Sequence, residues 1–164
     1  MKKRSLVLVL LLATVILLSS CGSKPEEFKD DRVLLRIDGE TLMTGLDFKR
    51  IRIAHTLAGE VYDESTVSDR DLFVQEAEKR LLSHFSQLYG VSASRELLEE
   101  DFDFHQQELE QQGTSKEEIE YNKKLLKELS MDSAAYKDWT VNQNWIEQNV
   151  ETLMTDILSD YQTV

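Results

Sequence analysis

The chain has 164 residues, with 19 Lys and Arg against 31 Asp and Glu, which gives a formal net charge of −12 at pH 7. So acidic a chain is poorly suited to neutralising phosphates, and we therefore exclude nucleic acid as a partner. The single cysteine excludes a disulfide framework and a thiolate metal cluster.

The first twenty residues predict a secretory signal. A basic head, Met1–Arg4, precedes an apolar run of about 13 residues, which is shorter than the roughly 20 needed to cross a bilayer. The stretch Leu18-Ser19-Ser20-Cys21 resembles the lipobox of bacterial lipoproteins, in which the cysteine receives lipid and becomes the new N-terminus. We therefore expect residues 1–20 to be a signal peptide, Cys21 to carry lipid such as palmitate, and the protein to be anchored outside the cytoplasm. The alternative is a soluble secreted protein with one free thiol.

Residues 21–31 are expected to form a flexible tether, because they have no apolar period and include Pro25, the only proline. Residues 32–164 are long enough to form one domain with a core of its own.

The domain is expected to begin with a hairpin and a helix. Val33–Ile37 and Glu40–Met43 have strand composition, and Asp38-Gly39 between them is a strong hairpin turn signal. Thr44 and Asp47 have the spacing that caps a helix start, and the apolar period that follows is expected to end at Gly59.

Four more helices are expected, and serine or glycine residues mark boundaries of the first three. The first runs over 68–90, and the second opens at Ser92 or Ser94 with Leu98, Phe102 and Leu109 facing inward. A capping box at 115–118 opens the third. The fourth is the longest and carries an apolar stripe, in which Tyr136, Trp139, Gln143, Ile146, Val150, Leu153 and Ile157 alternate spacings of three and four. The pattern predicts a mainly α domain: a small hairpin followed by a bundle of about five helices.

The sequence offers little for catalysis. It has no glycine-rich phosphate loop, no Gly-x-Ser-x-Gly, no His-Glu-x-x-His and no Cys-x-x-Cys. His105 and Glu108 lie three apart and would share one helix face, but a metal site takes three or four converging ligands, so a solvated acidic face is the favoured explanation of the pair. We expect no enzymatic activity, no metal and no cofactor.

Three stretches in this order resemble the SurA/PrsA-type foldases. Ile37-Asp38-Gly39-Glu40-Thr41-Leu42 is similar to the family's Val-Asn-Gly-Glu-x-Ile opening. Gly90-Val91-Ser92 with Glu96-Leu97 matches its second helix pattern, and Met131 with Tyr136 matches the start of its long helix. The resemblance covers roughly residues 33–157.

This resemblance implies an N-terminal helical chaperone domain that cradles unfolded exported polypeptide. Full-length members usually continue with a parvulin-type prolyl isomerase domain, but this sequence ends at Val164 directly after the last helix, so isomerase activity is not expected. The first hypothesis is a lipoprotein that binds unfolded or partly folded polypeptide through Phe48, Tyr121, Trp139 and Trp145. The alternative is an adaptor that docks one dedicated membrane-protein partner in an envelope complex.

Overall fold

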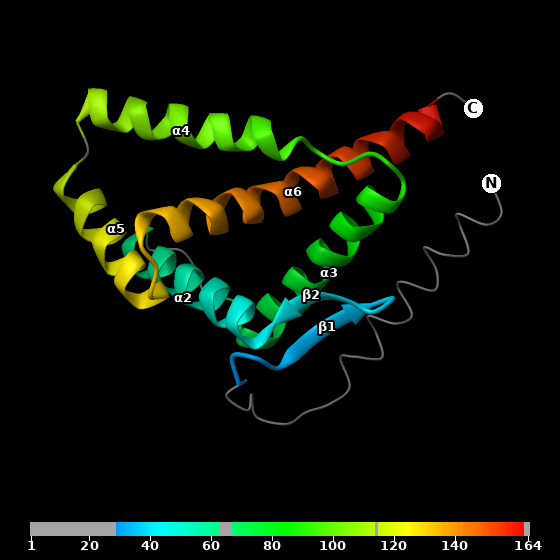
Figure 1. The fold of residues 1–164 in the computed structure, drawn as a ribbon, viewed down its shortest axis with the longest axis horizontal. Coiled ribbons are helices and arrows are strands. Elements are labelled where there is room, and N and C mark those ends of the chain that lie inside the picture. The colour runs from blue at the N-terminus through cyan, green and yellow to red at the C-terminus, as the bar shows by residue number, and fades with distance from the viewer. Residues whose placement is uncertain (1–28, 63–66, 114, 163–164) are drawn as a thin grey trace.

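A computed structural model describes residues 29–62, 67–113 and 115–162, so the predicted signal peptide and Cys21 lie outside the described residues. The described residues form a two-stranded hairpin followed by five helices, the last one long, which confirms the predicted mainly α class (Figure 1). The elements are β1 (Val33–Ile37), β2 (Glu40–Thr44), α2 (Gly45–Tyr62), α3 (Asp69–Leu88), α4 (Arg95–Gln112), α5 (Lys116–Leu129) and α6 (Ser133–Gln162). Among these helices, none is both long and apolar enough to span a membrane.

The hairpin forms as the sequence predicts. β1 and β2 pair antiparallel with Ile37 opposite Glu40, and the turn residues Asp38 and Gly39 have φ values of 48° and 85°. Two successive residues at positive φ match the turn whose twist suits a two-residue hairpin loop. β2 then delivers the chain directly into α2.

The predicted helix caps are confirmed. The Thr44 backbone N–H donates to Asp47 Oδ2 at 2.8 Å, and the Asp47 N–H donates to Thr44 Oγ1 at 3.2 Å. Ser68 caps α3, and Ser94, one of the two serines considered, caps α4. Ser115 opens α5 with the complete predicted capping box. These side chains satisfy backbone N–H groups that the first turn of a helix leaves without partners.

Two predicted boundaries are wrong. α2 does not end at Gly59 but continues to Tyr62, and the added turn carries Glu60, whose carboxylate lies 2.9 Å from Lys124 Nζ on α5. A glycine inside a helix costs only about 1 kcal/mol relative to alanine, so a packed helix can continue through it.

The second correction concerns the end of the predicted tether. The Arg32 N–H donates to the Lys29 carbonyl at 3.0 Å, and the Leu46 N–H donates to the Asp30 carbonyl at 3.0 Å. Lys49 Nζ also lies 3.3 Å from Asp30 Oδ1. Residues 29–31 therefore form a turn against the start of α2 and belong to the folded domain.

Two clusters of buried apolar side chains form part of the core, and Leu81, Val141, Ile146 and Leu153 are buried in addition to them. The first joins β2, α2 and α3 through Met43, Phe48, Ile51, Leu72 and Ala77. The second joins α2 to α5 through Leu57, Leu125 and Leu129. Trp139 of α6 packs against both clusters and so connects them.

Charged groups also fasten α3 to its neighbours. Arg80 is buried, and its Nη1 donates to the Leu42 carbonyl of β2 at 2.9 Å; burial lowers the pKa of this guanidinium from its usual value. Lys79 Nζ lies 2.9 Å from Glu147 of α6 and 3.1 Å from Glu76. Partial burial disfavours the charged ammonium, but these two carboxylates outweigh it and raise the pKa of Lys79 above 10.5.

A buried polar network joins α3, α6 and the linker between α3 and α4. Asn149 is fully buried, and its Oδ1 accepts from the Ala93 N–H at 2.7 Å while its Nδ2 donates to Ser83 Oγ at 2.9 Å. Trp145 Nε1 donates to the carbonyl of the same Ala93 at 3.0 Å. The two side chains of α6 thus hold both backbone groups of Ala93 and fix the point from which α4 departs.

We predict that Asn149→Ala lowers the free energy of unfolding by about 2–4 kcal/mol, because it deletes one buried and one partly buried hydrogen bond and leaves their partners unsatisfied. Asn144→Ala, at an exposed position on the same helix, is the control and is expected to change it by less than about 0.5 kcal/mol. Urea unfolding followed by circular dichroism measures both. Equal effects of the two substitutions would contradict a structural role for the network.

Candidate functional site

Two ion pairs link the first half of α4 to α6. Arg95 pairs with Asp138, and Lys137 Nζ lies 2.6 Å from Asp103 Oδ1. Among the described side chains of α4, none is buried. The two ion pairs lie in the first half of α4, and Figure 1 shows α4 and α6 diverging from there toward α5.

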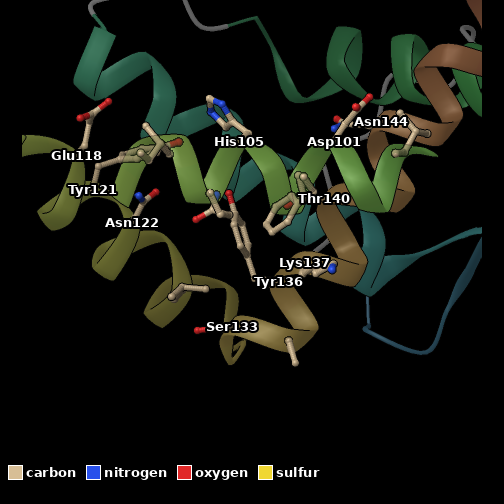
Figure 2. A pocket seen from close by; sticks show the side chains of 16 residues that line it. Asp101, His105, Glu118, Tyr121, Asn122, Ser133, Tyr136, Lys137, Thr140 and Asn144 are labelled. Carbon is tan, nitrogen blue, oxygen red and sulfur yellow. The ribbon is translucent and has the colours of Figure 1, made fainter. Parts of the chain in front are cut away.

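An open groove occupies the space between these three helices. Its volume is about 960 Å³, and α4, α5 and α6 each form one wall. The lining side chains are Leu98, Asp101, Phe102, His105, Gln106 and Leu109 from α4, Glu118, Tyr121, Asn122 and Leu126 from α5, and Ser133, Ala134, Tyr136, Lys137, Thr140 and Asn144 from α6 (Figure 2).

The large apolar side chains of the groove are half-exposed. They are Leu98, Phe102, Leu109, Tyr121, Leu126 and Tyr136. Leu98, Phe102 and Leu109 face inward as expected, toward α5 and α6, but none of the three is fully buried. Helix α5 turns its buried residues toward α2, so it does not cover the apolar face of α4. A face that the sequence marks as apolar thus forms the wall of an open cleft.

Polar groups are distributed around this apolar surface. Lys137 Nζ lies 5.9 Å from the centroid of the Phe102 ring, which is within reach of a cation–π interaction, and it also pairs with Asp103. The amide side chains of Gln106, Asn122 and Asn144 line the groove and are exposed. The groove therefore combines apolar contact surface with groups that can both donate and accept hydrogen bonds.

The arrangement offers no metal-binding constellation. His105 lines the groove and is exposed, while Glu108 is half-buried and does not line it. Across the described segments, no three His, Cys, Asp or Glu side chains lie close enough together to hold a metal ion.

The structure places one of the four predicted peptide-binding residues in the groove. Tyr121 of α5 lines it. Phe48 does not: it is 5% exposed and packs edge-to-face on Phe73 at a centroid distance of 5.4 Å. Its side chain belongs to the core because the first turns of α2 are sandwiched between the hairpin and α3, so the prediction for Phe48 is corrected.

The two tryptophans lie near the groove without lining it. Trp139 is half-buried between the two core clusters, and its ring lies 6.1 Å from that of Tyr136, which does line the groove. Trp145 is half-buried and holds the Ala93 carbonyl. Both therefore position helices that form the walls, and neither presents a face inside the groove.

Sequence reasoning missed Tyr136, Lys137 and Leu126 as groove residues. Tyr136 was assigned to the apolar stripe of the last helix, which is also where the core lies. One signal in the sequence was informative: residues 95–112 carry few apolar residues on the inward face for an 18-residue helix. A helix with so thin an apolar face is only partly covered by its neighbours.

A search against protein family models, one of curated proteins and one of solved structures each found no match for this chain.

If the groove is open, its walls contribute less to stability than the core does. We predict that Phe102→Ala lowers the free energy of unfolding by about 1 kcal/mol, because the ring is already half-exposed. Leu125→Ala, at a position 3% exposed in the core, is expected to cost about 2–5 kcal/mol. Urea denaturation compares them. A larger loss for Phe102→Ala than for Leu125→Ala would indicate a closed, packed interface in place of a groove.

Proposed function

We propose that the groove binds segments of unfolded or partly folded exported polypeptide, without catalysis, in a lipoprotein anchored outside the cytoplasm. The observation that carries the proposal is the set of half-exposed apolar side chains from three helices around an open volume of about 960 Å³. Each Å² of apolar surface that stays in contact with water forgoes roughly 25 cal/mol of stabilising free energy that burial would supply. A partner that covers them recovers that stabilisation.

The size and composition of the groove suit a polypeptide segment. Ligand pockets span roughly 300–1,000 Å³ and are predominantly apolar, so this groove lies at the upper end. Exposed Gln106, Asn122 and Asn144 can each donate and accept hydrogen bonds. A peptide backbone offers the same two groups at every residue, whatever its sequence. Apolar walls with adaptable amides therefore favour binding that tolerates many sequences.

The sequence motifs support the same proposal. The resemblance to SurA/PrsA-type foldases implies a domain that cradles exported polypeptide, and the lipobox-like Leu18–Cys21 implies a location where such polypeptides emerge. The hairpin that opens directly into a capped helix is the element on which the first family motif lies. This element scaffolds the core, and the proposed binding surface lies on the later helices.

We predict that Leu98→Ser combined with Phe102→Ser weakens binding of an unfolded model protein by at least about tenfold. Each substitution removes apolar contact worth on the order of 1 kcal/mol, and about 1.4 kcal/mol corresponds to a factor of ten. The measurement uses the full-length protein in a phosphatidylcholine nanodisc and follows suppression of aggregation of a reduced client over a range of protein concentrations.

The matched control lies on the same helix. Leu97→Ser with Phe104→Ser makes the same chemical change at residues that are 60% and 61% exposed and do not line the groove. This variant is expected to retain suppression. If it loses suppression while the groove variant keeps it, the binding surface lies on the outer flank of α4 and the groove proposal fails. Absence of suppression by the unsubstituted protein at stoichiometric excess would remove the chaperone-like function altogether.

The proposed anchor has a separate test. We predict that Cys21→Ser abolishes incorporation of radiolabelled palmitate and moves the protein out of the membrane fraction. Acyl chains contribute about 0.8 kcal/mol per buried CH₂, and two or more chains hold a protein stably. Fractionation of cells carrying each form gives the readout. Unchanged membrane association without label would show that another element holds the protein there.

A further inference from the structure

The charge that the groove leaves uncompensated is negative. Its one lysine, Lys137, is already paired with Asp103 at 2.6 Å. Asp101 is exposed, and the structure records no hydrogen bond or ion pair for it with any described residue. Glu118 accepts one bond, from the Ser115 N–H at 3.0 Å, and its carboxylate is otherwise exposed. A cation entering the groove therefore meets two carboxylates whose charge no basic side chain neutralises.

The wall formed by α4 extends this negative surface. This helix has no lysine, and its one arginine, Arg95, pairs with Glu99 and Asp138; His105 is its other basic residue. The acidic residues with described side chains on this helix are Glu96, Glu99, Glu100, Asp101, Asp103 and Glu108. Because a cleft lined by one sign of charge concentrates the field and attracts the opposite sign, α4 favours positively charged occupants. The same field opposes a second copy of this acidic chain.

We infer that the groove selects polypeptide segments that combine apolar side chains with lysine or arginine. This inference rests on the proposed polypeptide binding and names the class of segment preferred. The apolar side chains of the segment cover Leu98, Phe102 and Tyr136, while its cationic side chains reach Asp101 on α4 and Glu118 on α5. The two carboxylates belong to different walls, so one segment lying between them engages both.

The expected preference is moderate. Asp101 and Glu118 are exposed, and exposed ion pairs contribute little individually and weaken with salt. Among segments of equal apolar content, the carboxylates of the groove therefore favour the more basic segment and raise its association rate. The apolar contacts supply most of the affinity. Selection of this kind leaves the groove tolerant of sequence.

The test compares three fluorescent peptides that share one apolar pattern and carry Lys, Ser or Glu at the intervening positions. Binding to the full-length protein in neutral phosphatidylcholine nanodiscs is measured by anisotropy, with empty nanodiscs as the blank. We expect the Lys peptide to bind about tenfold more tightly than the Glu peptide at low salt. The ratio is expected to shrink toward one at 0.5 M NaCl, where the screening length is only a few ångströms.

Two double variants locate the selectivity. Asp101→Asn with Glu118→Gln is expected to weaken the Lys peptide about fivefold and to leave the Ser peptide unchanged; glutamine at 118 still completes the capping box. Glu78→Gln with Asp156→Asn makes the same change in net charge at exposed positions outside the groove and is expected to change neither affinity.

The outcomes separate the two proposals. Equal affinities for the Lys, Ser and Glu peptides would overturn the selectivity and leave polypeptide binding in place. An equal loss in both double variants would likewise overturn it, because the preference would then come from overall charge and not from the groove. No binding of any of the three peptides would overturn the proposed function itself.

Discussion

The groove depends on one buried contact, the hold of Asn149 on the backbone of Ala93. Asn149 is fully buried on α6, and its amide satisfies the Ala93 N–H and Ser83 Oγ at once. Burying an amide without partners costs roughly 1–3 kcal/mol, so the linker has one favourable position in which all three groups are paired. α4 begins two residues later, at Arg95, and its direction follows from where the linker is held. The ion pairs of Arg95 and Lys137 then keep its first half beside α6.

Different faces of α6 pack in the interior and line the groove. One face carries Trp139, Ile146 and Leu153 toward the apolar core, and a second carries Val141 and Asn149, which are both fully buried. The face that includes Ser133, Lys137, Thr140 and Asn144 lines the groove. α2, α3, α5 and the hairpin supply the core clusters, so α4 contributes little to them and its inner side is left uncovered. A bundle that needed α4 for its core would have no groove.

Local signals in the sequence predicted the elements, and tertiary packing decided the site. Hairpin, caps and helix order follow from residues that act on their immediate neighbours, such as Asp38-Gly39 and the Ser115–Glu118 box. Asn149 was missed because a polar residue off the apolar stripe looks solvent-exposed until its partners from α3 and the linker are known. Phe48 was placed wrongly for the converse reason: its partner, Phe73, lies on another helix. Periodicity marks Leu98 and Phe102 as apolar but does not say that no helix covers them.

The proposed anchor and the acidic groove fit together physically. A domain with so many carboxylates is repelled by an anionic lipid surface, and lipid on Cys21 would hold it within reach of that surface without letting it lie flat. Basic segments of exported chains would be drawn to the same anionic surface, and so would be concentrated near a domain anchored there by the proposed lipid. In the proposed role, the exposed carboxylates on α4 and α5 would compete with lipid headgroups for those segments, while the partly exposed rings of Phe102 and Tyr136 would cover the apolar side chains beside them. A groove without these carboxylates could still cover apolar side chains, but it would not compete with the lipid headgroups for basic ones.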